Sequence, residues 1–367
     1  MKTNDLLYQI ALTQINLIGC VQAKKLIDHF GNAADIFKAP KKLLSSIEGI
    51  GEIKASYIKN FIDFSDAEKE IKFIEKHTIE PLFITNPNYP KRLLHCYDAP
   101  TLLYYKGKAN LNQPKILSII GTRTNSAYGK EITETIIQEA QQHQALIISG
   151  LAYGIDSIAH KAAVQHNLAT VGVLAHGLDV LYPAQNKVLA KEMIAHGGGL
   201  LTEFMQNTKP DKHNFPKRNR IVAGMCDAMI VIETAAKGGS MITAEIAYTY
   251  NKDVYAVPGK TTDTKSAGCN KLIQQNKAMI FTNTQDLFAE IGWQQPITKA
   301  SKQKELFIDL NENEKIIYNI IAQKNNVQVD EIYLQSGLSS STVAACILNL
   351  ELQNIIISLP GKVYKIS

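Results

Sequence analysis

Seven short apolar runs separated by helical stretches constrain the fold of this chain more than any other feature. The runs are KILSIIG (115–121), ALIISG (145–150), TVGVLAHG (170–177), LLTEF (200–204), AMIVIE (228–233), VYAVPG (254–259) and AMIFT (278–282). Continuous apolar strands that alternate with helices are typical of a parallel sheet buried on both faces. We therefore expect an α/β fold, with a doubly wound, Rossmann-like parallel sheet over about 113–292.

A helical region precedes this sheet. Residues 1–80 contain two glycine turns, Leu17-Ile18-Gly19 and Glu48-Gly49-Ile50-Gly51, and an amphipathic stretch with lysines follows each turn. This pattern resembles a paired helix-hairpin-helix (SAM-like) domain, whose glycine turns offer backbone amides to a DNA phosphate. A helical module that only packs is the alternative. The proline-containing bridge after residue 80 carries an expected strand at Leu102–Tyr105, and we group it with the sheet as an extended Rossmann-like DNA-binding domain over 81–292.

A polar linker at 293–304 leads to a tail domain at 305–367. The tail pattern is helix (312–324), helix (330–336), a turn at Gly337, helix (340–353) and a hairpin (355–358 and 363–366), which describes a winged helix. Ser339 is placed to cap the third helix. This helix carries no lysine or arginine between Ser339 and Gln353. Because a DNA-reading helix normally needs basic side chains, we favour protein docking or weak regulation over strong DNA binding for the tail.

Composition points to a cytoplasmic protein. The amino-terminal stretch lacks a basic region followed by an apolar core, so no signal peptide is expected. The sequence contains no apolar run of about 18 residues, the length that a membrane-spanning helix requires. The 5 cysteines are scattered and odd in number, which argues against a disulfide framework or a zinc site and favours small buried side chains in a reducing compartment.

The chain contains few arginines, and most of them lie in two short motifs. Among 39 lysines and arginines, arginine stands only at Arg92, at Arg123 in Gly-Thr-Arg, and at Arg218 and Arg220 in FPKRNRIVAG (215–224). A guanidinium is planar and can donate two parallel hydrogen bonds to a phosphate, which a lysine ammonium cannot do. The segment 209–220 carries most of the chain's formal charge of +5, with Asp211 as its single acid. A focal basic segment indicates a polyanionic ligand.

The unusual motifs of the central region follow the expected strands. They are GTR (121–123), SGLAYGID (149–156), HGLDVLYPAQN (176–186), KGGSMITAE (237–245), VPGK (257–260) and GCNKLI (268–273). Carboxyl ends of parallel strands meet at one edge, so these loops predict one composite site with glycine-lined backbone and helix amino termini. The spacings of a P-loop and of G-x-G-x-x-G are absent, so no nucleotide cofactor is expected.

Candidate catalysts are weak by comparison. His176, Asp179, Asp156 and Glu233 could form a carboxylate–imidazole set, but no serine elbow, H-E-x-x-H or aspartate pair accompanies them. Asp156 is more typical of a turn or helix amino terminus. Tyr182-Pro183 is a rigid turn that either packs or exposes its ring for base stacking.

In order, these motifs resemble the DNA-processing protein A (DprA/Smf) family over about 80–292, with Gly-Thr-Arg in place of Gly-Ser-Arg and Gly-Gly-Ser in place of Ser-Gly-Ser. The resemblance implies a cytoplasmic bacterial protein that is not an enzyme, needs no cofactor or metal, and does not bind membranes. It implies that the chain binds single-stranded DNA, protects incoming strands during natural transformation and loads the RecA recombinase. It also implies a homodimer formed through the Rossmann-like domain.

The same resemblance implies two groups of site residues. The DNA path is lined by Arg123, Lys187, Lys217, Arg218, Asn219 and Arg220. The phosphate pocket is shaped by Gly121, Thr122, Ser149, Gly150, Gly154, Gly239 and Ser240.

Two alternatives stay open. One is a nucleotide-binding or nucleotide-hydrolysing enzyme similar to the lysine-decarboxylase-like Rossmann group, whose motif is Pro-Gly-Gly-x-Gly-Thr-x-x-Glu. Here Gly238-Gly239 and Glu245 match its ends, but Lys237 replaces the proline and Met241-Ile242 replace Gly-Thr. The other is a nucleotide sensor at the same sheet edge. Release of base from nucleoside monophosphates indicates the enzyme, and saturable binding without turnover indicates the sensor.

Overall fold

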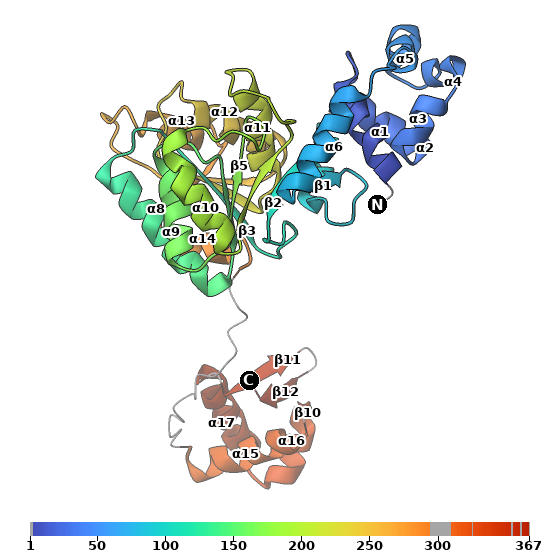
Figure 1. Ribbon diagram of the computed structural model, residues 1–367. Helices are drawn as coiled ribbons and strands as arrows, with labels where there is room; N and C mark the ends of the chain where they lie inside the picture. Colours follow the sequence, from blue (N-terminus) through green and yellow to red (C-terminus); the bar gives the residue numbers. More distant parts are fainter. Residues whose placement is uncertain (1–2, 294–309, 325, 354, 360–361, 367) are drawn as a thin grey trace. The chain divides into compact units, whose positions relative to one another are not determined.

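The computed structural model describes residues 3–293, 310–324, 326–353, 355–359 and 362–366 (Figure 1). The chain forms two compact units, Met1–Gln294 and Gln295–Ser367, which are described separately. The first unit holds the helical region and the Rossmann-like domain. The second unit holds the tail domain.

A nine-stranded sheet organises the first unit, in the order β1-β2-β6-β5-β4-β3-β7-β8-β9. Its strands are β1 (Glu80–Phe83), β2 (Leu102–Gly107), β3 (Ile116–Ile120), β4 (Leu146–Ser149), β5 (Thr170–Val173), β6 (Gly199–Thr202), β7 (Ala228–Val231), β8 (Asp253–Ala256) and β9 (Met279–Ile280). The seven expected strands all form, and β3 to β9 pair in parallel, which confirms the doubly wound sheet. The structure adds an antiparallel extension, because β2 pairs with β6 and β1 pairs with β2. We did not predict β1, whose second residue is Pro81; an edge strand tolerates proline.

Helices cover both faces of this sheet (Figure 1). One face carries α8 (Ala127–Ala140), α9 (Ile155–Gln165), α10 (Lys187–Ala195), α14 (Thr284–Glu290) and the short helices η1 (Gln141–His143) and η2 (Ala184–Asn186); the other carries α11 (Asn214–Gly224), α12 (Gly239–Thr249) and α13 (Ala267–Gln274). On β3, Leu117 and Ile119 join one core, whereas Ile116 and Ile120 join the other. The strand sequences are continuously apolar because both faces are buried.

The helical module lies ahead of β1. It contains α1 (Thr3–Gln14), α2 (Cys20–Phe30), α3 (Ala33–Lys38), α4 (Lys41–Ser45), α5 (Gly51–Lys59) and α6 (Ser65–His77), and α7 (Lys91–Leu94) follows between β1 and β2. Gly19 is the amino-terminal cap of α2, and positive φ occurs at Gly49 and at Gly51, the first residue of α5, as the two glycine turns predict. One hydrophobic core runs from Leu26 in this module through Leu103 to Val222 in the sheet domain. Our boundary at residue 80 remains a prediction, since the two folds share this core.

The second unit is a winged helix, as expected. Its elements are α15 (Glu312–Gln323), β10 (Val327–Gln328), α16 (Val329–Ser336), α17 (Ser340–Leu352), β11 (Ile356–Leu359) and β12 (Val363–Ile366). The side chain of Ser339 accepts the amide N–H of Thr342 at 3.2 Å, which confirms the predicted cap. We did not predict β10, which pairs with β12. The expected linker after residue 293 and the hairpin tip at 360–361 lie outside the described residues.

Within the described ranges, no helix combines the length and the apolar character that crossing a membrane requires.

Candidate nucleic-acid interface

A cavity lies where the strand order of the sheet reverses. From β3 the chain proceeds outward through β4, β5 and β6, then returns to β7 on the other side of β3. Open α/β sheets bind ligands in the crevice at such a switch point. The cavity measures about 480 Å³. It is lined by Ile120, Gly121, Thr122, Arg123, Gly150, Ala152, Asp156, Phe215, Arg218, Asn219, Val222, Thr234, Ala235, Gly238, Gly239, Ser240 and Thr243.

The loops after β3, β4 and β7 thus meet in this cavity, and the loop after β5 borders it. The loop after β8 does not line it. There the hydroxyl of Tyr128 donates to the carbonyl of Pro258 at 3.4 Å, and Asn270 binds the backbone of Gly259. This loop packs against α8 and α13. Of the strand ends expected at the site, those of β3, β4, β5 and β7 border it and that of β8 does not.

Arg218 places a buried positive charge in the cavity wall. Its side chain is 5% exposed, and Nη1 donates to the carbonyl of Val173 at 2.8 Å. Among the described residues, its Nε atom is buried without a hydrogen-bond partner. Burial lowers the pKa of Arg218 to about 10, Asp156 opposes that change, and Arg123 adds to it. Arg218 is therefore charged at neutral pH and retains donor capacity for a ligand oxygen.

Arg123 and three aromatic rings flank this charge. The guanidinium carbon of Arg123 lies 5.5 Å from the centroid of the Phe215 ring, a cation–π arrangement. A narrower cavity opens beside the first one and is shared by both arginines; Tyr153, Tyr182 and Phe215 line it. The rings of Tyr182 and Phe215 are 6.3 Å apart. We did not assign Phe215, although it stands one helical turn before Arg218 in the quoted motif.

Two glycines permit the close packing around the arginines. A Cβ atom at Gly150 would lie 1.8 Å from Nη1 of Arg218, so no side chain fits there. Gly154 has φ +72°, and a Cβ atom there would lie 2.3 Å from the carbonyl oxygen of Thr122. Both positions require glycine. Gly154 therefore shapes the turn after β4 from behind the cavity rather than lining it.

The amino terminus of α12 forms another part of the cavity wall. The helix begins at Gly239, and its first residues, Gly239 and Ser240, line the cavity. First-turn amides of a helix have no intrahelical partner, and the helix dipole adds partial positive charge. This wall and Arg218 together create a site suited to an anion.

Besides Gly154, four of the predicted site residues lie outside the cavity. Ser149 is buried and donates to the carbonyl of Ile119 at 2.6 Å, so it supports the sheet. Lys187 is exposed at the start of α10 and lines neither cavity. Lys217 and Arg220 line another crevice of the same unit, beside Gly19. Residues three apart on a helix share a face, so α11 turns Lys217 and Arg220 away from the side that presents Arg218 and Asn219.

Arg220 is engaged in an ion pair. It pairs with Glu203 and donates to the backbone carbonyl of Asp98. The two ion-pair side chains are 12% and 15% exposed. Burial raises the pKa of Glu203, and Arg220 opposes that change. A contact between Arg220 and DNA stays a prediction, and its observed partners are structural.

The candidate catalytic set does not assemble. His176 accepts the Tyr182 amide N–H at 3.1 Å, and Asp179 accepts that of Asn207 at 3.0 Å. Asp156 accepts the amides of Gly150 and Ala152, and Glu233 accepts that of Ser126. Each side chain holds backbone at a separate place, as expected for Asp156. Across the described ranges, no cluster of three or more His, Cys, Asp or Glu side chains could hold a metal ion.

The fold and the cavity define a Rossmann-like protein with a cationic pocket at the switch point of its sheet. Family models then narrow this class. The model of DNA recombination-mediator protein A matches residues 80–292, that of a SAM-like helix-hairpin-helix tandem matches 10–62, and that of the DprA winged helix domain matches 308–362. The chain belongs to the DNA recombination-mediator protein A (DprA/Smf) family.

Individual relatives agree with this assignment. The chain is 31% identical to protein Smf of Synechocystis sp. over the whole of both chains. It is 38% identical to the DNA processing protein DprA of Streptococcus pneumoniae, over 64% of this chain and 82% of the relative. The X-ray structure of the S. pneumoniae protein matches 77% of this chain and 97% of its own, with 34% identity and a TM-score of 0.67. A Helicobacter pylori DNA processing protein A structure, described for its single-stranded DNA binding mode, matches 58% of this chain and 95% of its own, with 31% identity and a TM-score of 0.53.

The two arginines of α11 should differ in their effect on stability. We expect Arg220→Ala to lower the free energy of unfolding by about 3 kcal/mol, because Glu203 is left buried without its partner. Arg218→Met should cost about 1 kcal/mol or less, because it removes one hydrogen bond and leaves no ion-paired carboxylate alone. Urea unfolding followed through the single tryptophan, Trp293, which is buried in the first unit, measures both changes.

The double variant Arg220→Met with Glu203→Leu is the control, and it should recover most of the stability that Arg220→Ala loses. Equal losses for Arg218→Met and Arg220→Ala would contradict the structural role assigned to Arg220.

Proposed function

We propose that this protein binds single-stranded DNA in the cavity at the switch point and performs no chemistry on it. The observation that carries the proposal is the buried guanidinium of Arg218, which lines the same cavity as the amino terminus of α12. A buried charge is costly unless a partner compensates it. A DNA phosphate would supply that partner and would accept the free donors of Arg218 and α12.

A single strand fits this site better than a duplex. Phe215, Tyr182 and Tyr153 lie next to the cationic cavity, so a nucleotide could place its phosphate on Arg218 and its base on an aromatic ring. Base–aromatic stacking requires an unstacked base, which single strands offer. The H. pylori relative, described for its single-stranded DNA binding mode, supports the same ligand class.

The position of Glu245 argues against the nucleotide-cleaving alternative. This residue matches the end of the enzyme motif, but its carboxylate forms an ion pair with Lys277 at 3.0 Å and is half-exposed. Glu245 does not line the cavity, whereas Ser240 and Thr243 on the same helix do. The nearby carboxylates of Asp156 and Glu233 accept backbone amides instead. A nucleotide sensor would use the same pocket, and competition between nucleoside monophosphates and a DNA strand distinguishes it.

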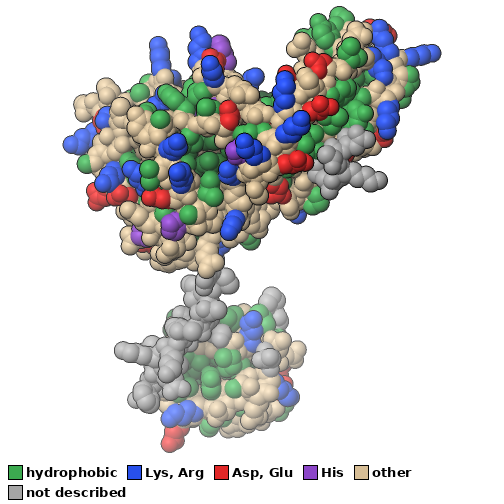
Figure 2. Space-filling model, viewed as in Figure 1, with side chains coloured by type: hydrophobic (Ala, Val, Ile, Leu, Met, Phe, Trp, Pro, Cys, Tyr) green, Lys and Arg blue, Asp and Glu red, His purple; other side chains and the backbone are tan. Residues whose placement is uncertain are grey.

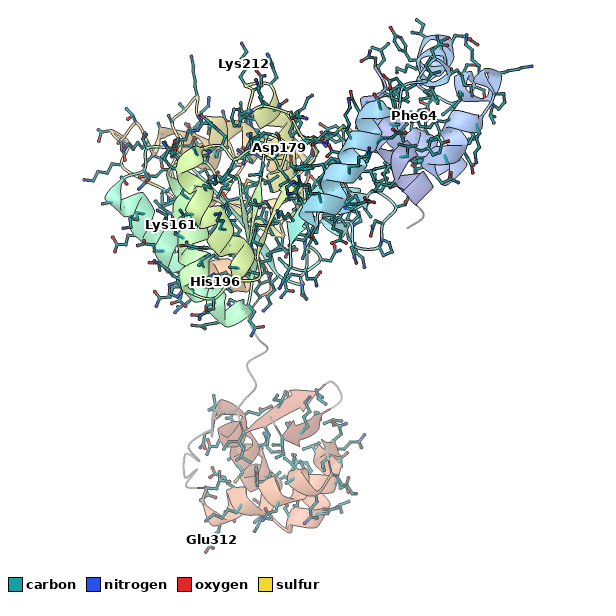
Figure 3. The ribbon with its side chains drawn as sticks, in the orientation of Figure 1. Phe64, Lys161, Asp179, His196, Lys212 and Glu312 are labelled. Carbon is teal, nitrogen blue, oxygen red and sulfur yellow. The ribbon has the colours of Figure 1, made fainter. Side chains whose placement is uncertain are left out.

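We expect single-stranded DNA to bind more tightly than duplex, with a log–log salt slope of about −0.7 for each phosphate neutralised. Arg123→Ala and Arg218→Met should each weaken binding of a thymidine oligonucleotide about tenfold, because each removes a charge-assisted contact to phosphate. Fluorescence anisotropy across a salt series measures both effects. Lys161→Ala is the matched control, because Lys161 is exposed on α9 (Figure 3) and lines neither cavity. Unchanged affinity in folded arginine variants, or a preference for duplex, would contradict the proposal.

A homodimer through the Rossmann-like domain is the second part of the proposal. Strand β9 is the edge of the sheet and pairs only with β8 among the described strands. Its two residues, Met279 and Ile280, are 42% and 51% exposed, and Tyr248 is half-exposed beside them in the same crevice. An exposed apolar strand edge is a template for pairing with another strand. A second copy of the chain is the partner that the family resemblance implies.

Ile280→Asp should therefore convert a dimer into a monomer, since a buried unpaired carboxylate opposes association. Sedimentation or light scattering gives the mass. Val188→Asp, at an exposed position on α10, is the control and should stay dimeric. A monomeric parent protein, or an Ile280→Asp variant that stays dimeric, would rule out this edge as the interface.

Loading of RecA during natural transformation is the third part, and the family resemblance alone supports it. The protein should shorten the lag before RecA filaments form on DNA coated with single-strand-binding protein, because it would present bare strand to the recombinase. An unchanged lag before filament formation would contradict this role.

A further inference from the structure

The basic segment 209–220 follows a short stretch, 205–208, at which the helical module and the sheet domain meet. We call this stretch the joint. The backbone leaves β6 and passes through 205–208 before it reaches Lys209 and Lys212. Glu70 of α6, in the helical module, accepts the amide N–H of Gln206 at 3.0 and 3.3 Å with its two carboxylate oxygens. Asp179, from the loop after β5, accepts the next amide, that of Asn207, at 3.0 Å. Consecutive amides are therefore held from two sides by two carboxylates.

Two further contacts fix the same short stretch. The amide of Gly177 donates to the carbonyl of Thr208 at 3.0 Å, and the side-chain amide of Gln14 on α1 lies 3.2 Å from the sulfur of Met205. Asn207 has φ +64°, a left-handed conformation that asparagine tolerates better than most residues. The joint thus has a defined geometry, and half of its contacts come from the helical module.

Beyond the joint, the segment has only local support in the described structure. Asp211 accepts the amides of His213 and Asn214 at 2.8 and 3.0 Å. The lysines at 209 and 212 are exposed, and Figure 2 shows basic side chains projecting from this edge of the unit. In Figure 3, Lys212 projects outward and Asp179 lies on the side of α6. The next side chain with contacts outside the segment is Phe215, which lies against Arg123 and Tyr182, so the direction of the two lysines depends on how the joint is held.

Glu70 is unusually buried for a glutamate whose hydrogen-bond partner is a backbone amide. Its side chain is 1% exposed, and no cation pairs with it among the described residues. The hydroxyl of Tyr104 is buried and has no hydrogen-bond partner in the described part of the chain, and the charge of Glu70 raises the pKa of this hydroxyl. A buried carboxylate without a cation is costly. An apolar residue would pack at lower cost, but it could not accept the Gln206 amide.

We propose that Glu70 is a positioning residue for DNA binding: from the helical module it fixes the start of the basic segment and so sets where the segment's lysines meet the strand. The inference rests on the proposed function, because it concerns the path of DNA toward the switch-point cavity. It gives the helical module a part in binding that requires no contact between that module and DNA.

The protonation of Glu70 should tune this joint. Burial raises the pKa of Glu70 to about 7, the hydrogen bond from Gln206 opposes that change, and Asp179 adds to it. Asp179 faces Glu70 from the sheet domain, Tyr104 from β2, and Asp63, Asp66 and Lys69 line the adjoining crevice. Below pH 7 the neutral carboxyl keeps an acceptor for Gln206 and does not repel Asp179. The contribution to stability is full below the ordinary pKa of glutamate and is lost as the pH rises through about 7, so alkaline pH loosens the joint.

The test compares Glu70→Ala and Glu70→Gln with the parent, and Glu68→Ala, an exposed change on the same helix, is the matched control. Hydrogen exchange over 203–214 without DNA reports the joint directly. Affinity for a thymidine oligonucleotide between pH 6 and 8.5 reports its effect on binding. All chains carry His213→Gln, so that the comparison is made without the histidine of this segment.

We expect Glu70→Ala to speed exchange over 203–214 and to weaken DNA binding about fivefold, as for one lost hydrogen bond. Glu70→Gln keeps an acceptor oxygen, so it should hold the parent's affinity at pH 6 and lose the decline toward pH 8.5. Parent-like exchange in Glu70→Ala, or a parent-like pH decline in Glu70→Gln, overturns the proposal. If Glu70→Ala does not fold, the pH profile of Glu70→Gln decides. Failure of the proposed function is distinguishable, because then Arg123→Ala also leaves DNA affinity unchanged while the exchange measurement still tests the joint.

Discussion

The buried charge of Arg218 is the constraint on which the binding site depends. A guanidinium that is 5% exposed needs acceptors, and the residues that the structure describes supply one carbonyl, from Val173. Gly150 must lack a side chain to admit it, and Asp156 lies close enough to oppose the fall in its pKa. Arg218 lines a cavity that the amino terminus of α12 also lines. The protein therefore has a cationic pocket before any ligand arrives, and an anion relieves the cost of that pocket.

The four arginines divide into two pairs by their partners. Arg92 is ion-paired with Asp227 at 2.7 Å, and Arg220 is ion-paired with Glu203; both tie separate segments of the first unit together. Arg123 and Arg218 form no ion pair among the described residues, and both line the cavity. A guanidinium suits both tasks because its planar fork satisfies several acceptors at once. The presence or absence of an ion pair thus distinguishes the arginines that stabilise the fold from those available to a ligand.

Sequence patterns predicted the fold well because burial on both faces leaves a continuous apolar run, as in β3 and β7. They missed β1, where a proline at an edge strand hides the pattern, and β10, which has two residues. For the site, glycine turns predicted the convergence of the strand ends of β3, β4, β5 and β7, but wrongly included that of β8. They could not predict which face of α11 meets the cavity, because Lys217, Arg218, Asn219 and Arg220 are adjacent and only the helix rotation separates them. The ion pair of Arg220 joins residues 17 apart through packing that no local pattern encodes.

A crystal structure of the protein with a short thymidine oligonucleotide tests the central claim most directly. The account predicts a phosphate oxygen about 3 Å from the guanidinium of Arg218, as in a charge-assisted hydrogen bond. It also predicts a second contact with the first-turn amides of α12 and a base resting on Phe215. A strand that instead followed Lys187 or Lys217 and left this cavity without a phosphate would contradict the account.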